Sequence, residues 1–205
     1  MHQDADRRRV EEKPRLEVPS IALLSIEGTT FELFSSLLQD IGKERLRSAG
    51  IINRALIECL ADGNWIAKKP DRAQKYLDAV KEFHQYMTSV APTLIADQPV
   101  NIKEKAGWTT SAVANRVEQL GPKAVFLYDY YSYFTHVSPA FYSMAIADPM
   151  LRRVAYSSLH HGLSSTLNIS RLMCVASEVY SEAEALRIYA INEAFLQVPS
   201  TVDNL

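Results

Sequence analysis

The residues best suited to chemistry lie close together in the tyrosine-rich stretch that runs from Tyr128 to Pro139. If this stretch is helical, i, i+3, i+4 and i+7 spacing brings four polar side chains to one side: Asp129, Ser132, Tyr133 and His136. A histidine near a carboxylate in an aromatic setting can act as a general acid or base, or help to hold a small polar ligand. On another side of this helix we expect four core residues: Phe126, Tyr130, Phe134 and Val137.

A second polar group is expected on an earlier helix, where Arg54 and Glu58 share a face at i, i+4 spacing. We expect this pair to meet Asp129 and His136 across a helical bundle. Such a buried cluster could bind a small polar ligand or a protein partner. The alternative is a polar network that fixes the register of the helices and binds nothing.

Three segments carry a resemblance to a known family. The segment Arg54-Ala55-Leu56-Ile57-Glu58 resembles the R-x-L-x-E element of a widespread bacterial family of all-helical proteins of unknown function. The segment that begins at Trp108 resembles the family's W-x-x-x-S element, although its serine comes one residue early, and the stretch that ends at Ser138 resembles its S/Y-x-x-x-H-x-S element. The resemblance covers about residues 45–140. It implies a helical bundle in which Arg54, Glu58 and His136 converge, and it adds Trp108 and Ser138 to the expected ligand-binding residues.

Arg153 and His160 form a third group, because seven residues make two helical turns and bring both side chains to one side within about 20°. This pair resembles the motif of HEPN-type ribonucleases, which implies a metal-independent enzyme that acts on RNA as a dimer. In that chemistry the histidine moves the 2′-hydroxyl proton, the arginine stabilises the phosphate, and His161 is an alternative base. The alternative is a solvent-facing polar stripe on an amphipathic helix.

The elements that must position these residues are helices. Apolar residues recur at helical spacing, whereas hairpin turns and period-2 alternation are almost absent. The sequence therefore predicts an all-α protein with a single bundle of about six to eight helices over residues 18–198. We expect Gly28 to bend or break the first helix, Pro92 to end the third near Val90, and Ser181 with Glu184 to cap the last. Residues 1–17 are expected to form a mobile charged leader and residues 199–205 a frayed tail.

Composition narrows the classes of protein that remain. The 205 residues have a formal net charge of -2, which argues against a protein that coats nucleic acid. The two cysteines are far apart and outside any C-x-x-C pair, and no zinc, di-iron or glycine-loop nucleotide motif occurs, so we expect no metal and no cofactor. No run of about 18 apolar residues is evident, so we expect no membrane span and a cytoplasmic location. A homodimer and an interaction scaffold without a catalytic site are further alternatives.

Overall fold

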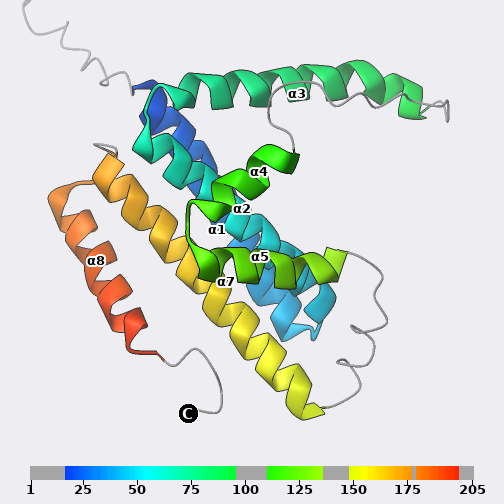
Figure 1. Cartoon of the computed structure of the whole chain (residues 1–205), viewed down its shortest axis with the longest axis vertical. Helices are drawn as coiled ribbons and strands as arrows, with labels where there is room; N and C mark the ends of the chain where they lie inside the picture. Colours follow the sequence, from blue (N-terminus) through cyan, green and yellow to red (C-terminus); the bar gives the residue numbers. More distant parts are fainter. Residues whose placement is uncertain (1–16, 96–109, 136–147, 177–178, 199–205) are drawn as a thin grey trace, which may run out of the picture.

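The computed structural model describes residues 17–95, 110–135, 148–176 and 179–198, and this part of the chain contains seven α-helices and no strand (Figure 1). The helices are α1 (Val18–Gly42), α2 (Leu46–Lys68), α3 (Arg72–Ile95), α4 (Thr110–Glu118), α5 (Pro122–Thr135), α7 (Asp148–Ala176) and α8 (Glu182–Leu196). The prediction of an all-α bundle with six to eight helices is confirmed. The expected leader, apart from Glu17, and the expected tail lie outside the described residues.

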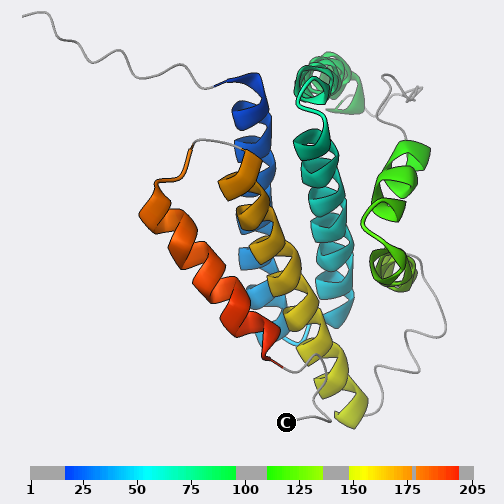
Figure 2. The ribbon, with the colours of Figure 1, turned by 60° about the vertical axis from the view of Figure 1, so that its left-hand side comes forward.

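The centre of the bundle is formed by α1, α2 and α7, which pack on one another along most of their length (Figure 2). The pair α4 and α5 covers the outer side of α2, and α8 packs on the opposite side of the bundle against α7. Helix α3 runs crosswise over one end of this bundle and packs mainly on α1 (Figure 1). The position of α2 between α7 and α5 brings side chains from all three helices together.

Helix α1 differs from its prediction in two respects. It continues without a break through Gly28, because Ile26 and Thr30 on either side are buried in the bundle and packing outweighs the low helix propensity of glycine. Among the described residues α1 is also long and apolar enough to cross a membrane by length and composition, which overturns the expectation that no segment has these properties. Core helices of soluble proteins and N-terminal signal sequences both meet the same criterion, and in this chain Leu23, Ile26 and Leu37 of α1 are buried.

The helix ends follow local signals with one exception. Ser181 and Glu184 form the predicted capping box at the start of α8, and Gly121, with a φ of 103°, separates α4 from α5. The prediction that α3 ends near Val90 is wrong, because α3 continues through Pro92 to Ile95. The φ of a proline suits a helix, so α3 can accommodate Pro92 with the loss of one backbone hydrogen bond.

The buried side of α5 agrees only in part with the one that helical spacing predicted, because Phe134 is buried as expected but Phe126 is not. Tyr128, Tyr131 and Phe134 are buried, whereas Phe126, which was expected in the core, is 67% exposed. Phe134 fits against α2 because Gly50 has no side chain, and a Cβ atom at this position would overlap the ring. The buried side of α5 is therefore decided by its contact with α2. Of the other two residues expected in the core, Tyr130 is half-buried and Val137 lies outside the described residues.

Candidate functional site

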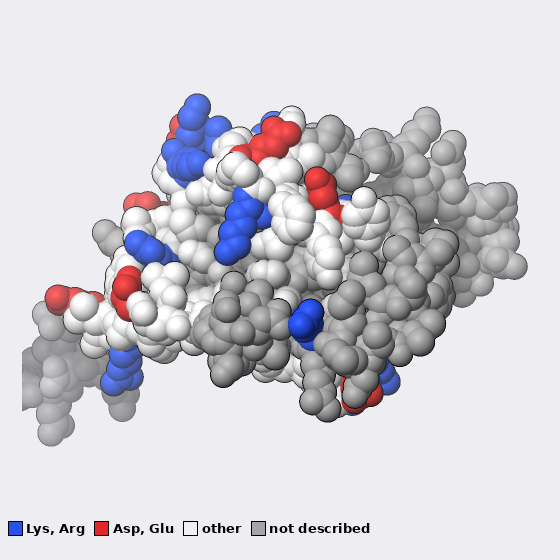
Figure 3. All heavy atoms as spheres, turned by 60° about the horizontal axis from the view of Figure 1, so that its bottom comes forward, with Lys and Arg blue, Asp and Glu red and all other residues white. Residues whose placement is uncertain are grey.

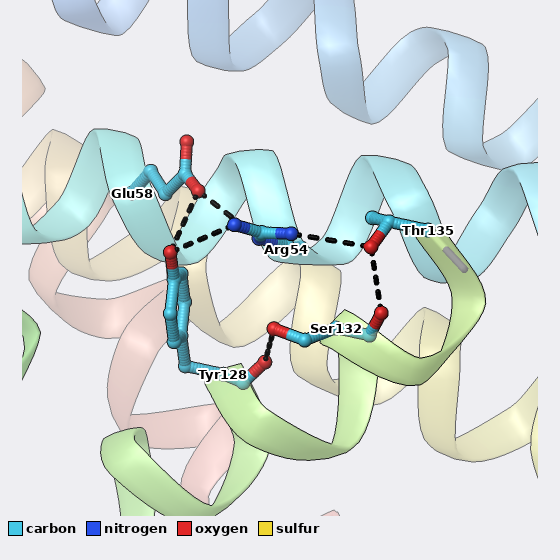
Figure 4. A network of polar contacts seen from close by, with 5 residues as sticks. All are labelled: Arg54, Glu58, Tyr128, Ser132 and Thr135. Carbon is cyan, nitrogen blue, oxygen red and sulfur yellow. Dashed lines mark hydrogen bonds and ion pairs between the residues drawn. The ribbon is translucent and has the colours of Figure 1, made fainter. Parts of the chain in front are cut away.

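The predicted polar pair of α2 is present and reaches α5 (Figure 4). The Nε atom of Arg54 donates to Oε1 of Glu58 at 3.2 Å, and its Nη2 atom donates to the hydroxyl of Tyr128 at 3.0 Å. Its Nη1 atom donates to Oγ1 of Thr135 at 3.3 Å, and Tyr128 in turn donates to Oε1 of Glu58 at 3.2 Å. All three guanidinium nitrogens are thus bonded to protein. We call Arg54, Glu58, Tyr128 and Thr135 the Arg54 network, and its hydrogen bonds connect α5 to α2.

The protonation states of the Arg54 network follow from burial and from its own charges. Burial alone would lower the pKa of Arg54, but the contacts with Tyr128 and Glu58 outweigh burial and raise it. Burial raises the pKa of Tyr128. The carboxylate of Glu58 raises it further, whereas Arg54 lowers it by less than these two effects raise it. The phenol therefore stays protonated at neutral pH and can donate its hydrogen bond to Glu58. Because the side chains of Arg54 and Glu58 are 22% and 35% exposed, their ion pair contributes no more than about 0.5 kcal/mol to stability.

Two of the other residues expected to bind a ligand do not join this network. Asp129 and Tyr133 lie on the exposed side of α5, and Tyr133 is 65% exposed. The expectation that these two residues face Arg54 is wrong, because α5 turns Tyr128, Tyr131 and Phe134 towards α2 instead. The remaining three residues, His136, Ser138 and Trp108, lie outside the described residues.

The pair expected under the ribonuclease alternative is found in two different environments on α7. Arg153 is exposed to solvent. The ring of His160 packs against the ring of Phe195 from α8, with the two centroids 4.7 Å apart, and burial together with the charge of Lys123 lowers the pKa of His160. Helix α8 thus covers part of His160, whereas Arg153 is exposed to solvent.

His161, the alternative base in that interpretation, is bonded to a residue that the sequence did not single out. The hydroxyl of Tyr131 lies 2.8 Å from Nδ1 of His161, and Tyr131 is completely buried. Burial, together with the charges of His160 and Lys123, lowers the pKa of His161 to about 4, and burial raises the pKa of Tyr131. At neutral pH the imidazole is therefore uncharged, and the tautomer with its proton on Nε2 accepts the hydrogen bond at Nδ1.

A cleft of about 480 Å³ opens beside this hydrogen bond, with walls formed by α2, α5 and α7. The side chains from α2, α5 and the turn before α5 are mostly apolar: Ile57, Leu60, Asn64, Leu120, Lys123, Ala124 and Leu127. Those from α7 are mostly polar: His160, His161, Ser164, Ser165, Asn168, Arg171, Leu172 and Val175. The volume of the cleft falls within the range of small-molecule sites, which commonly combine an apolar lining with a few polar groups.

The chemistry available in this cleft is that of hydrogen bonding and positive charge. Two cationic side chains, two histidines and several hydroxyl and amide groups line it, and in the part of the chain that the structure describes no carboxylate does. The described residues contain no group of three or more His, Cys, Asp or Glu side chains placed to hold a metal ion. The described part of the lining therefore offers hydrogen-bonding groups and positive charge.

Surface charge can be judged on one face of the molecule. Over the described part of the face drawn in Figure 3, basic and acidic side chains are interspersed among uncharged residues. A nucleic-acid-binding surface commonly shows a basic stripe or patch. This face therefore gives the ribonuclease alternative no electrostatic support.

The cleft residues were only partly foreseen. His160 and His161 were noted, whereas Lys123, Asn168 and Arg171 were not. A usable signal was present on α7, where polar residues recur at helical spacing at positions 160, 164, 168 and 171. The ion pair between Arg116 of α4 and Asp62 of α2 was also missed, since its partners are far apart in sequence.

No family model, no curated protein and no solved structure matches this chain. The two resemblances drawn from the sequence, to the bacterial family of helical proteins and to HEPN-type ribonucleases, therefore stay predictions.

Proposed function

We propose that this protein binds a small polar ligand, and that the cleft between α2, α5 and α7 is the binding site. The observation that carries the proposal is the lining of the cleft, which places histidine, serine, asparagine and cationic groups opposite apolar side chains in about 480 Å³. The sequence led us to expect a ligand among Arg, Glu, Tyr and His side chains. The structure offers more room at His161 than at Arg54, whose nitrogens already have protein partners.

The Arg54 network has a supporting role in this proposal. It connects α2 to α5 through Tyr128 and Thr135, while Ala124 and Leu127 of the same α5 line the cleft. The hydrogen bond between Tyr131 and His161 connects α5 to α7 on the other side. Together these bonds hold α5 at the distance from α2 and α7 that keeps the cleft open.

Native mass spectrometry of protein purified from its expression host tests the proposal, together with a fragment screen followed by NMR. We expect wild type to carry extra mass that is lost on denaturation, or fragments to shift the resonances of cleft residues such as His161. Ala124→Trp should fill the cleft and abolish both signals, whereas Ala190→Trp, on the exposed side of α8, should leave them unchanged.

Ser164→Met is a second cleft-filling variant in case Ala124→Trp does not fold, which circular dichroism would show. Binding that survives in the folded cleft-filling variants would place the ligand elsewhere. If wild type carried no added mass and no fragment shifted a cleft resonance, the proposal would be wrong.

A further inference from the structure

The cleft has a charge bias that narrows the class of ligand. Its lining includes Lys123 from α5 and Arg171 from α7, and none of the described residues that line it is an aspartate or glutamate. Positive side chains around a partly apolar cavity attract anions, and apolar walls strengthen the field between them. A cationic ligand would meet only repulsion from charged groups in this lining.

The cationic and hydrogen-bonding side chains Lys123, His160, His161 and Ser164 line the cleft near the start of α5. Lys123 is close enough to His160 and His161 for its charge to lower the pKa of both rings. It lies in the first turn of α5, where the helix dipole also favours negative charge. Ser164 follows His160 by one turn of α7 and lines the same part of the cleft.

Arg171 lies farther along the cleft. It is eleven residues from His160, which corresponds to about 16 Å along α7. Its guanidinium lies over the ring of Tyr189 of α8, with 5.7 Å between the guanidinium carbon and the ring centroid. Lys123 is therefore better placed than Arg171 to meet an anion beside the two histidines.

The opposite wall is suited to an apolar body. Ile57 and Leu60 of α2 and Leu127 of α5 face the polar side chains of α7 across the cleft. Near Leu60, the amide nitrogen of Asn64 is buried without a hydrogen-bond partner among the described residues. A buried donor of this kind calls for an acceptor, which an oxygen atom of a ligand would supply.

We propose that the cleft binds an organic anion whose carboxylate or phosphate group lies at Lys123, His160 and His161 and whose apolar body lies against Ile57, Leu60 and Leu127. This inference rests on the proposed function, because it names the ligand class of the same cleft.

Binding of four matched probes, measured by calorimetry and by NMR, tests the inference. Two of the probes are anions, 2-naphthoate and 2-naphthyl phosphate. The other two are the neutral 2-naphthamide and the cationic 2-naphthylmethylammonium. We expect at least one of the two anions to bind tenfold or more tightly than the amide, and the cation to bind least. Whichever anion binds more tightly identifies the headgroup.

Two charge variants locate the anion. Lys123→Gln should weaken binding of the tighter anion about tenfold and leave the amide unchanged, whereas Arg171→Gln should weaken it less than about threefold. Both side chains are exposed, so neither change should disturb folding. A larger loss in Arg171→Gln would overturn the assigned position. If the amide bound as tightly as the anions, the cleft would remain a ligand site but the inference would be wrong. If no probe shifted a cleft resonance, the proposed function would fail as well.

Discussion

The contact between Tyr131 and His161 predicts that the protein loses stability in mild acid. Nδ1 of the buried imidazole is hydrogen-bonded to the hydroxyl of Tyr131 at 2.8 Å, and burial, with the charges of His160 and Lys123, lowers the pKa of His161 from an ordinary value of 6.5 to about 4. Protonation would force His161 to donate at Nδ1, and the buried hydroxyl of Tyr131 would then lack an acceptor for its own proton.

The size and sign of the effect follow from proton linkage. Above pH 7 His161 is neutral in both the folded and the unfolded chain and has no influence on the pH dependence. As the pH falls below 6.5 the unfolded chain binds a proton that the folded protein does not, so the free energy of unfolding decreases. At pH 5 the loss is about 2 kcal/mol, since 1.5 units separate this pH from 6.5 and each unit corresponds to about 1.36 kcal/mol. The loss is complete below about pH 4, and the partial exposure of the ring makes these figures upper limits.

Urea denaturation followed by circular dichroism at pH 7.5 and pH 5 measures this effect. His161→Gln removes the titrating ring, so the difference in stability between wild type and this variant should narrow by up to about 2 kcal/mol between the two pH values. His84→Gln, on an exposed side of α3, should keep a constant difference from wild type and serves as the control. If the difference for His161→Gln stayed constant within about 0.5 kcal/mol, the argument for a neutral buried imidazole would be refuted.

Two further predictions concern packing and the ribonuclease alternative. Gly50→Ala should lower the free energy of unfolding by about 1–3 kcal/mol because the added methyl group overlaps the ring of Phe134. The methyl group added by Gly28→Ala meets no atom within 4 Å, so this variant should raise the free energy of unfolding by about 0.5–1 kcal/mol. Urea denaturation of both variants measures these changes, and equal effects of the two substitutions would contradict the prediction. Purified wild type should cleave a fluorescent RNA no faster than His160→Ala does, and cleavage that is lost in a folded His160→Ala variant would instead favour the ribonuclease.

The sequence by itself determined the features that depend on neighbours along the chain. Capping of α8 by Ser181 and Glu184, the break at Gly121 and the pairing of Arg54 with Glu58 all involve residues within one turn or in adjoining turns. Helical periodicity acts over the same short range, which is why the all-α class followed from the sequence. These local signals remain the same whatever the helix packs against.

Only the tertiary structure decided which side of α5 is buried and where a ligand has room. Aromatic residues occur on all sides of α5, so periodicity predicted Phe134 but could not select Tyr131 over Phe126. The choice depends on Gly50, 84 residues before Phe134, because its missing side chain admits that ring. The cleft likewise combines side chains from three helices that are far apart in sequence, and packing between helices, which acts through space and not along the chain, brings them together.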